Sequence, residues 1–139
     1  MADEAHNVAI LKAAYKRWSD SKGGSADDWL KICADNIAFG SLAQGAVPAA
    51  HYLTAYQSRD ALRDYFAGLS RDWEMIEYVA DQFVAQGDRV VMLGRCSYRN
   101  RKSGKVVSTP KADAWRLRAG KAVEFFEYYD TAQVHAAAM

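Results

Sequence analysis

The chain has 139 residues, of which half are hydrophobic and a quarter are charged. This length and composition fit one folded domain over residues 1–139 with its own core. The formal net charge is +1, and the absence of a basic stripe or an acidic tail argues against nucleic acid or an anionic membrane surface as a partner.

The sequence predicts neither a signal peptide nor a membrane-spanning segment. No apolar run reaches the ~18 residues of a membrane span, and the N-terminus has acids first and no apolar signal-peptide core. Cys33 and Cys96 are far apart, which argues against a disulfide framework or a zinc site. We therefore expect two reduced thiols in a cytoplasmic protein.

Three helices are expected in the first half of the chain. The first covers residues 3–19, where apolar residues recur at helical spacing. A glycine-containing turn then leads to a short second helix that begins at Ser25 or Asp27. A short strand over residues 37–42 and an aromatic stretch precede the third helix, which begins at Ser58 or Arg59.

The second half of the chain predicts four strands, joined by turns over residues 86–88, 100–104 and 119–120. They cover residues 73–85, 89–99, 105–118 and 121–131. Three hairpins in succession make an antiparallel meander. Helices first and strands later is the α+β order, with helices packed on one face of a curved sheet, and the last residues are expected to be a frayed tail. The inside of such a cone is the natural pocket.

Asp113 is the first candidate for chemistry. Alternation along its strand places Asp113 on the same face as Trp115 and Leu117, toward the core. Burial of a charged acid is costly unless the acid is paired or protonated. A protonated Asp113 would be a hydrogen-bond donor or a general acid, whereas the structural alternative is an ion pair with Lys111 or Arg95.

Two further residues are candidates for acid–base work. Asp130 ends the last strand and shares a face with Phe126 and Tyr128, so it is a possible general acid or base at the pocket mouth. Its structural alternative is a capping role together with Thr131. Tyr15 lies on the apolar stripe of the first helix, where its phenol is either a donor to a developing oxyanion or an ordinary core hydroxyl.

The histidines do not predict a metal site. His6 and His135 lie near the termini, and His51 lies in the aromatic stretch without a visible partner. The chain also lacks a glycine-rich phosphate loop and a GxSxG elbow. We therefore expect no metal and no cofactor.

Three segments carry a resemblance to a known superfamily. ADNIAFG (residues 34–40), SRDALRDYFAGL (58–69) and DAWRLRAGKAVEFFEYYDTA (113–132) resemble segments of SnoaL-like proteins in the nuclear transport factor 2-like superfamily. Members include ketosteroid isomerases, polyketide cyclases, scytalone dehydratase and limonene epoxide hydrolase. The resemblance implies a cone-shaped α+β barrel, with three N-terminal helices packed on a curved, mostly antiparallel sheet.

The resemblance also implies roles for individual residues. Tyr15 falls where ketosteroid isomerases carry the oxyanion-hole tyrosine, and Asp113 where they carry a protonated aspartate. Their base aspartate, just after the first strand, is replaced by Ser41, which cannot abstract a proton unaided. Asp130 resembles the aspartate of the SnoaL-like EYxD ending and is expected to supply the acid–base function instead.

These roles together predict a small cofactor-independent isomerase, cyclase or dehydratase that acts on a hydrophobic, carbonyl-bearing molecule through Tyr15, Asp113 and Asp130. The expected pocket wall is Trp18, Phe39, Ser41, Tyr56, Phe66, Trp115 and Tyr128. The main alternative is a non-catalytic domain that binds a small ligand or only dimerises, and a scaffold role like that of a dioxygenase small subunit ranks last. A homodimer is expected because the outer sheet face would carry apolar residues such as Val123 and Phe125.

Overall fold

The computed structural model describes residues 3–47 and 50–139, which form four helices and five strands. No helix in these two ranges has the length and apolar character that crossing a membrane requires. The elements in chain order are α1 (Glu4–Asp20), α2 (Ala26–Ile32), β1 (Cys33–Ser41), α3 (Leu62–Asp72), β2 (Trp73–Gln86), β3 (Arg89–Asn100), β4 (Val106–Arg118), β5 (Lys121–Tyr129) and α4 (Thr131–Ala137).

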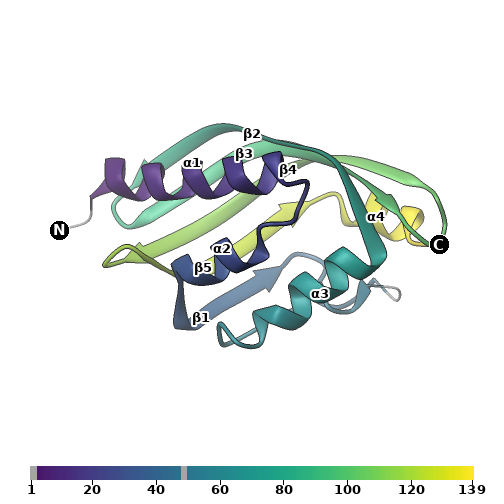
Figure 1. Ribbon diagram of the computed structural model, residues 1–139, viewed down its shortest axis with the longest axis horizontal. Helices are drawn as coiled ribbons and strands as arrows, with labels where there is room; N and C mark the ends of the chain where they lie inside the picture. Colours follow the sequence, from purple (N-terminus) through teal and green to yellow (C-terminus); the bar gives the residue numbers. More distant parts are fainter. Residues whose placement is uncertain (1–2, 48–49) are drawn as a thin grey trace.

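The strands form one curved sheet in the order β1-β5-β4-β3-β2. Strands β2 to β5 pair antiparallel through three consecutive hairpins, whereas β1 pairs parallel with β5. The helices α1, α2 and α3 lie over one face of the sheet, and α4 lies near one end (Figure 1). The predicted α+β class with an antiparallel meander is therefore confirmed, but the sheet is mixed and does not close into a barrel.

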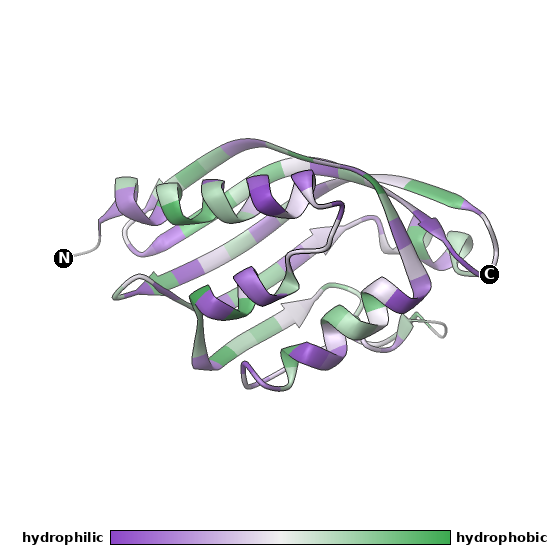
Figure 2. Ribbon diagram, viewed as in Figure 1, coloured by the Kyte–Doolittle hydropathy of each residue, from purple (hydrophilic) through white to green (hydrophobic). Residues whose placement is uncertain are grey.

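The three N-terminal helices that the resemblance implies are not matched, because the described residues form four helices. Two helices precede β1 and a third follows it, in the order that the residue pattern predicts. The fourth helix, α4, extends into the last four residues, where a frayed tail is expected. The third helix begins at Leu62, later than predicted, because the chain first makes a turn in which the Ser58 hydroxyl accepts a hydrogen bond from the Ala61 amide. Figure 2 shows hydrophilic residues interrupting the hydrophobic ones along α1, as expected of a helix with one buried side.

A bulge in β5 decides which of its side chains face the core. Ala122 pairs with Leu117, but the next pair in the ladder is Glu124 with Arg116, so the register shifts between them. An extra residue in one strand moves every later side chain to the opposite face. Phe125 is consequently buried, which corrects the expectation that it lies on the outer face.

Aromatic side chains fill the space between the helices and the sheet. Trp29 of α2 stacks on Trp115 of β4 with ring centroids 5.3 Å apart, and Phe39 of β1 stacks on Phe125 of β5 at 4.2 Å. Such pairs stabilise a core beyond the area they bury. Because aromatic rings offer few polar partners, polar side chains in this interior form hydrogen bonds and ion pairs with one another.

Candidate functional site

Three charged side chains of β4 and β5 meet inside the core. Lys111 and Asp113 are two residues apart on β4 and both lie on its inward face, and Glu127 lies directly opposite Asp113 on β5. Lys111 Nζ lies 3.0 Å from Glu127 Oε2 and 3.3 Å from Asp113 Oδ1, and the Lys111 side chain is only 11% exposed. One ammonium group thus lies between two buried carboxylates.

Hydroxyl groups of three tyrosines surround this cluster. Tyr15 Oη donates to Asp113 Oδ2 at 2.5 Å, and Tyr78 Oη donates to the same oxygen at 3.1 Å. Tyr65 Oη donates to Glu127 Oε2 at 3.2 Å. Asp113 Oδ1 accepts no hydrogen bond within the described ranges, although it is within ion-pair distance of the ammonium group. Both acids are acceptors in every one of these contacts.

Burial and the neighbouring charges together set the pKa values of the cluster. It raises the pKa of Glu127, and the nearby Lys111 ammonium opposes that rise. Burial acts to lower the pKa of Lys111, but the charges of Asp113 and Glu127 reverse this and hold its pKa well above the usual range. Burial also raises the pKa of Tyr65. At neutral pH Lys111 is therefore a cation, Tyr65 is a neutral donor, and Glu127 binds a proton more readily than an exposed glutamate.

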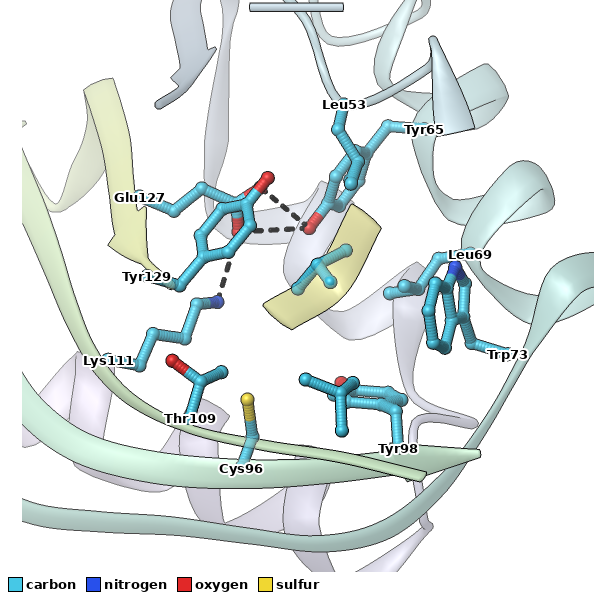
Figure 3. Close-up of a pocket in the computed structure, with 12 residues that line it drawn as sticks. Leu53, Tyr65, Leu69, Trp73, Cys96, Tyr98, Thr109, Lys111, Glu127 and Tyr129 are labelled. Carbon is cyan, nitrogen blue, oxygen red and sulfur yellow. Dashed lines mark hydrogen bonds and ion pairs between the residues drawn. The ribbon is translucent and has the colours of Figure 1, made fainter. Parts of the chain in front are cut away.

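A cavity of about 60 Å³ lies against the cluster, between α3, α4 and the inward face of the sheet (Figure 3). Lys111, Glu127, Tyr65 and Tyr129 form its polar side. The other side is largely apolar and includes Leu53, Leu69, Val107 and Val134. This volume holds a few water molecules or one small functional group, and is well below that of a pocket for a whole drug-sized ligand.

Ser41 lies beside the residue that provides the carboxylate of the site. It ends β1, is 2% exposed, and is paired in register with Glu127 of the neighbouring strand. Its Oγ lies 2.7 Å from Tyr129 Oη. Position 41 therefore has no acid of its own, but Glu127 places a carboxylate directly beside it.

The described part of the chain contains no group of three or more histidine, cysteine or acidic side chains that could hold a metal ion. Cys96 lines the cavity, but burial raises the pKa of its thiol to about 11. A protonated thiol is a poor nucleophile. Glu127 is the carboxyl group in the cavity wall, and a carboxyl group can take up and release a proton.

The model of the SnoaL-like domain family matches residues 11–125 of the chain. The chain belongs to the SnoaL-like domain family. No curated protein matches the sequence significantly. One fold can host unrelated reactions, so the function of this SnoaL-like domain depends on the residues of its site.

Solved structures show the same fold. An NTF2-like protein from Burkholderia thailandensis superimposes with a TM-score of 0.80 at 27% identity, over 96% of this chain and 97% of that one. A protein named as a SnoaL-like polyketide cyclase from Jannaschia sp. CCS1 gives 0.78 at 18% identity, over 97% and 92%. A protein with a ketosteroid isomerase-like fold from Catenulispora acidiphila, in complex with trimethylamine, gives 0.73 at 14%, over 93% and 91%.

Two of the three predicted catalytic residues are brought together in this SnoaL-like domain. Tyr15 and Asp113 share a hydrogen bond, and Trp115 Nε1 donates to Tyr15 Oη at 2.9 Å. Neither residue lines the cavity. Tyr15 and Asp113 lie behind Lys111 as seen from the cavity. The distance of 3.3 Å between Lys111 Nζ and Asp113 Oδ1 confirms the predicted ion pair. The other expected partner, Arg95, instead pairs with acids of β2.

Asp130 lies apart from this group. Strand β5 ends at Tyr129, and Asp130 is the exposed N-cap of α4, where its Oδ1 accepts a hydrogen bond from the Gln133 amide at 3.0 Å. The capping alternative is confirmed, with the difference that Thr131 is the first residue of α4.

Asp130→Ala is expected to lower the free energy of unfolding by about 1 kcal/mol, because it removes the N-cap acceptor. Asp130→Asn keeps an acceptor and should cost less. Urea denaturation of both variants measures the difference. An Asp130→Ala variant as stable as the wild type would contradict the capping role.

The prediction of the pocket wall is wrong, because none of the seven residues expected there lines the cavity. Tyr128 is 47% exposed on the outer sheet face, because the bulge in β5 turns it away from the core. Phe39 stacks on Phe125 in the core, and Tyr56 Oη donates a hydrogen bond to the backbone oxygen of Tyr52 at 2.6 Å. None of these three predicted residues lines the cavity.

The remaining predicted wall residues divide into three groups. Trp115 is buried against Trp29, and Ser41 touches the cavity-lining Tyr129. Trp18 and Phe66 pack edge to face and line a separate groove.

Glu127, at the centre of the site, is not among the predicted site residues. The sequence analysis predicts the opposite facing of β5, with Phe126 and Tyr128 toward the core, whereas Glu127 is buried and Tyr128 is exposed. The signal was present in the alternation Phe125, Glu127, Tyr129, which places an acid between two aromatic side chains on one face. Two adjacent phenylalanines make both facings plausible, and only the bulge decides between them.

Proposed function

We propose that this SnoaL-like domain is a cofactor-independent acid–base enzyme of the isomerase, cyclase or dehydratase type, acting on a hydrophobic molecule with a carbonyl group. The supporting observation is Glu127, a carboxyl group 2% exposed in the wall of a largely apolar cavity, with Lys111 and Tyr65 in contact with it. Burial raises the pKa of Glu127. Acids in such surroundings are suited to proton transfer near neutral pH.

In the proposed reaction the carbonyl end of the substrate enters the cavity. Glu127 removes a proton from the carbon next to the carbonyl, and the oxygen gains negative charge. The Lys111 ammonium and the Tyr65 hydroxyl stabilise that charge, because both are preformed donors in a site of low dielectric. Glu127 then returns the proton to another atom of the substrate. Asp113 and Tyr15 act as positioning residues that hold Lys111.

The direct test is exchange of substrate hydrogens with solvent. Cyclic ketones and polyketide-like aromatic ketones are incubated with the protein in D2O, and loss of the signals of the hydrogens next to the carbonyl is followed by NMR. We expect exchange faster than in buffer alone for at least one ketone that also raises the melting temperature. Thermal stabilisation by ketones without any exchange would reject the enzyme proposal.

The second candidate function is binding without catalysis. Lys111 contacts both buried carboxylates and the cavity is only about 60 Å³, which are features of a structural network as well as of a site. A pure binding domain would bind ketones but would show no exchange in the wild type or in any variant. The exchange measurement therefore separates the candidates.

We further propose a homodimer that pairs the outer faces of two sheets. Aligned outward positions of β2 to β5 carry apolar side chains, among them Val84, Leu93 and Tyr128, each more than a third exposed. A patch of this kind on a lone sheet face favours association. Leu93→Lys with Tyr128→Lys is expected to convert a dimer into a monomer in light scattering at micromolar concentration. A monomeric wild type would contradict the proposal.

The cytoplasm is the proposed location of the protein. Cys33 and Cys96 are both buried as free thiols, and burial raises the pKa of each. Reduced thiols of this kind fit a reducing compartment. Fluorescence microscopy of the tagged chain in its host tests the location.

A further inference from the structure

A second hollow adjoins the cavity. It is a groove of about 300 Å³ along the end of α1, α3 and the start of β2, with Trp18 and Phe66 among its apolar side chains. Leu69, Trp73 and Tyr98 line both the groove and the cavity. The wall between the two spaces is therefore one side chain thick. Together they reach the volume range of sites for drug-sized ligands, which the cavity alone does not.

The rim of the groove has an excess of positive charge. Lys22 and Arg101 line it, and neither forms an ion pair within residues 3–47 and 50–139. Each donates a hydrogen bond to a backbone oxygen, at 2.9 and 3.2 Å. Glu74 also lines the groove, but Arg99 lies 3.1 Å from its carboxylate and balances its charge. Two cations thus remain available to an anionic group.

We infer that the groove binds the aromatic body and a carboxylate of the substrate, whose ketone end occupies the cavity. The inference rests on the proposed function and names its substrate class as aryl ketones that carry a carboxylate at the far end. Aromatic rings pack against Trp18 and Phe66, and a carboxylate accepts charge-assisted hydrogen bonds from Lys22 and Arg101. Entry to the cavity requires movement of the wall formed by Leu69 and Tyr98.

The probes are 6-acetyl-2-naphthoate and its methyl ester, which differ in charge at one end and share the ketone at the other. They are titrated into the ¹⁵N-labelled full chain, and indole N–H signals are followed by NMR. We expect the acid to bind about fivefold to tenfold more tightly than the ester. The signals of Trp18 and Trp73 should shift more than that of Trp29, which lies outside both spaces.

The Lys22→Met/Arg101→Met double variant should bind the acid and the ester equally. The matched control is Lys121→Met, which removes a lysine that also donates to a backbone oxygen, at 2.7 Å, but lies outside the groove. It should keep the preference for the acid. Equal affinities in the wild type, a preference that survives in the double variant, or Kd values weaker than about 1 mM for both probes overturn the inference.

Exchange of the acetyl hydrogens in D2O separates this inference from the proposed function. Exchange of both probes without a preference for the acid rejects the groove assignment and leaves the proposed reaction standing. A preference that depends on Lys22 and Arg101, without exchange, rejects the reaction and supports the groove as a site for anionic aromatic ligands.

Discussion

Lys111→Met is expected to lower the free energy of unfolding by about 3–5 kcal/mol, the range measured when one partner of a buried ion pair is removed. Lys111 Nζ lies 3.0 Å from Glu127 and 3.3 Å from Asp113. Methionine fills a similar volume but leaves two buried carboxylates without their cation. Urea denaturation followed by tryptophan fluorescence measures the loss.

The loss should depend on pH. Burial raises the pKa of Glu127, and removal of Lys111 takes away the opposing effect. A carboxyl group whose pKa is higher in the folded than in the unfolded state favours folding below its unfolded pKa and loses that contribution as pH rises through the folded value. The variant should therefore be closest to the wild type near the ordinary pKa of glutamate, about 4.3, and should fall further below it as pH rises through the raised pKa of Glu127.

Two controls make this result specific to the cluster. Lys16→Met breaks an exposed pair with Asp20, whose side chains are 75% and 64% exposed, and should leave the free energy of unfolding almost unchanged. Adding Glu127→Gln to Lys111→Met should restore part of the lost stability, because one of the two stranded charges is removed. A Lys111→Met variant as stable as Lys16→Met at every pH would contradict the ion-pair description.

Local signals in the sequence were sufficient for much of the fold. The turns at Gly87 and Gly120 have positive φ angles of 61° and 75°, which glycine adopts without strain, and both hairpins form where they were expected. Alternation along β4 placed Asp113 toward the core, where it is 1% exposed. These features depend on neighbouring residues only, so a single sequence reveals them.

The residues whose positions differ from the prediction are placed by pairing between strands. The facing of β5 after Ala122 is set by a bulge against β4, and no turn residue in the sequence marks it. The pattern of β5 alone therefore does not predict that Glu127 faces the core. The pairing of Glu127 with Ser41 requires the parallel contact between β1 and β5, which joins segments far apart in the chain. Periodicity within one segment carries no information about such contacts.

Glu127→Gln is expected to lower the rate of hydrogen exchange of a bound ketone by about 10²–10⁴, the usual contribution of a general base. Glutamine keeps the shape of the side chain and one acceptor oxygen for Lys111 or Tyr65, but it cannot take up a proton. Binding should therefore change by only a few fold in the NMR titration. In the wild type the rate should rise with pH as Glu127 ionises. The rise should be centred above the range of an exposed glutamate, because burial raises the pKa of Glu127.

The matched control is Glu124→Gln, which changes the same residue type on the same strand. Its side chain is 48% exposed on the outer face and pairs with Arg89 and Arg116, away from the cavity. Its exchange rate should equal that of the wild type. Tyr65→Phe should lower the rate less than Glu127→Gln, because Lys111 still stabilises the oxygen. Equal rates in Glu127→Gln and Glu124→Gln would mean that Glu127 belongs to the buried ion-pair network and not to the chemistry.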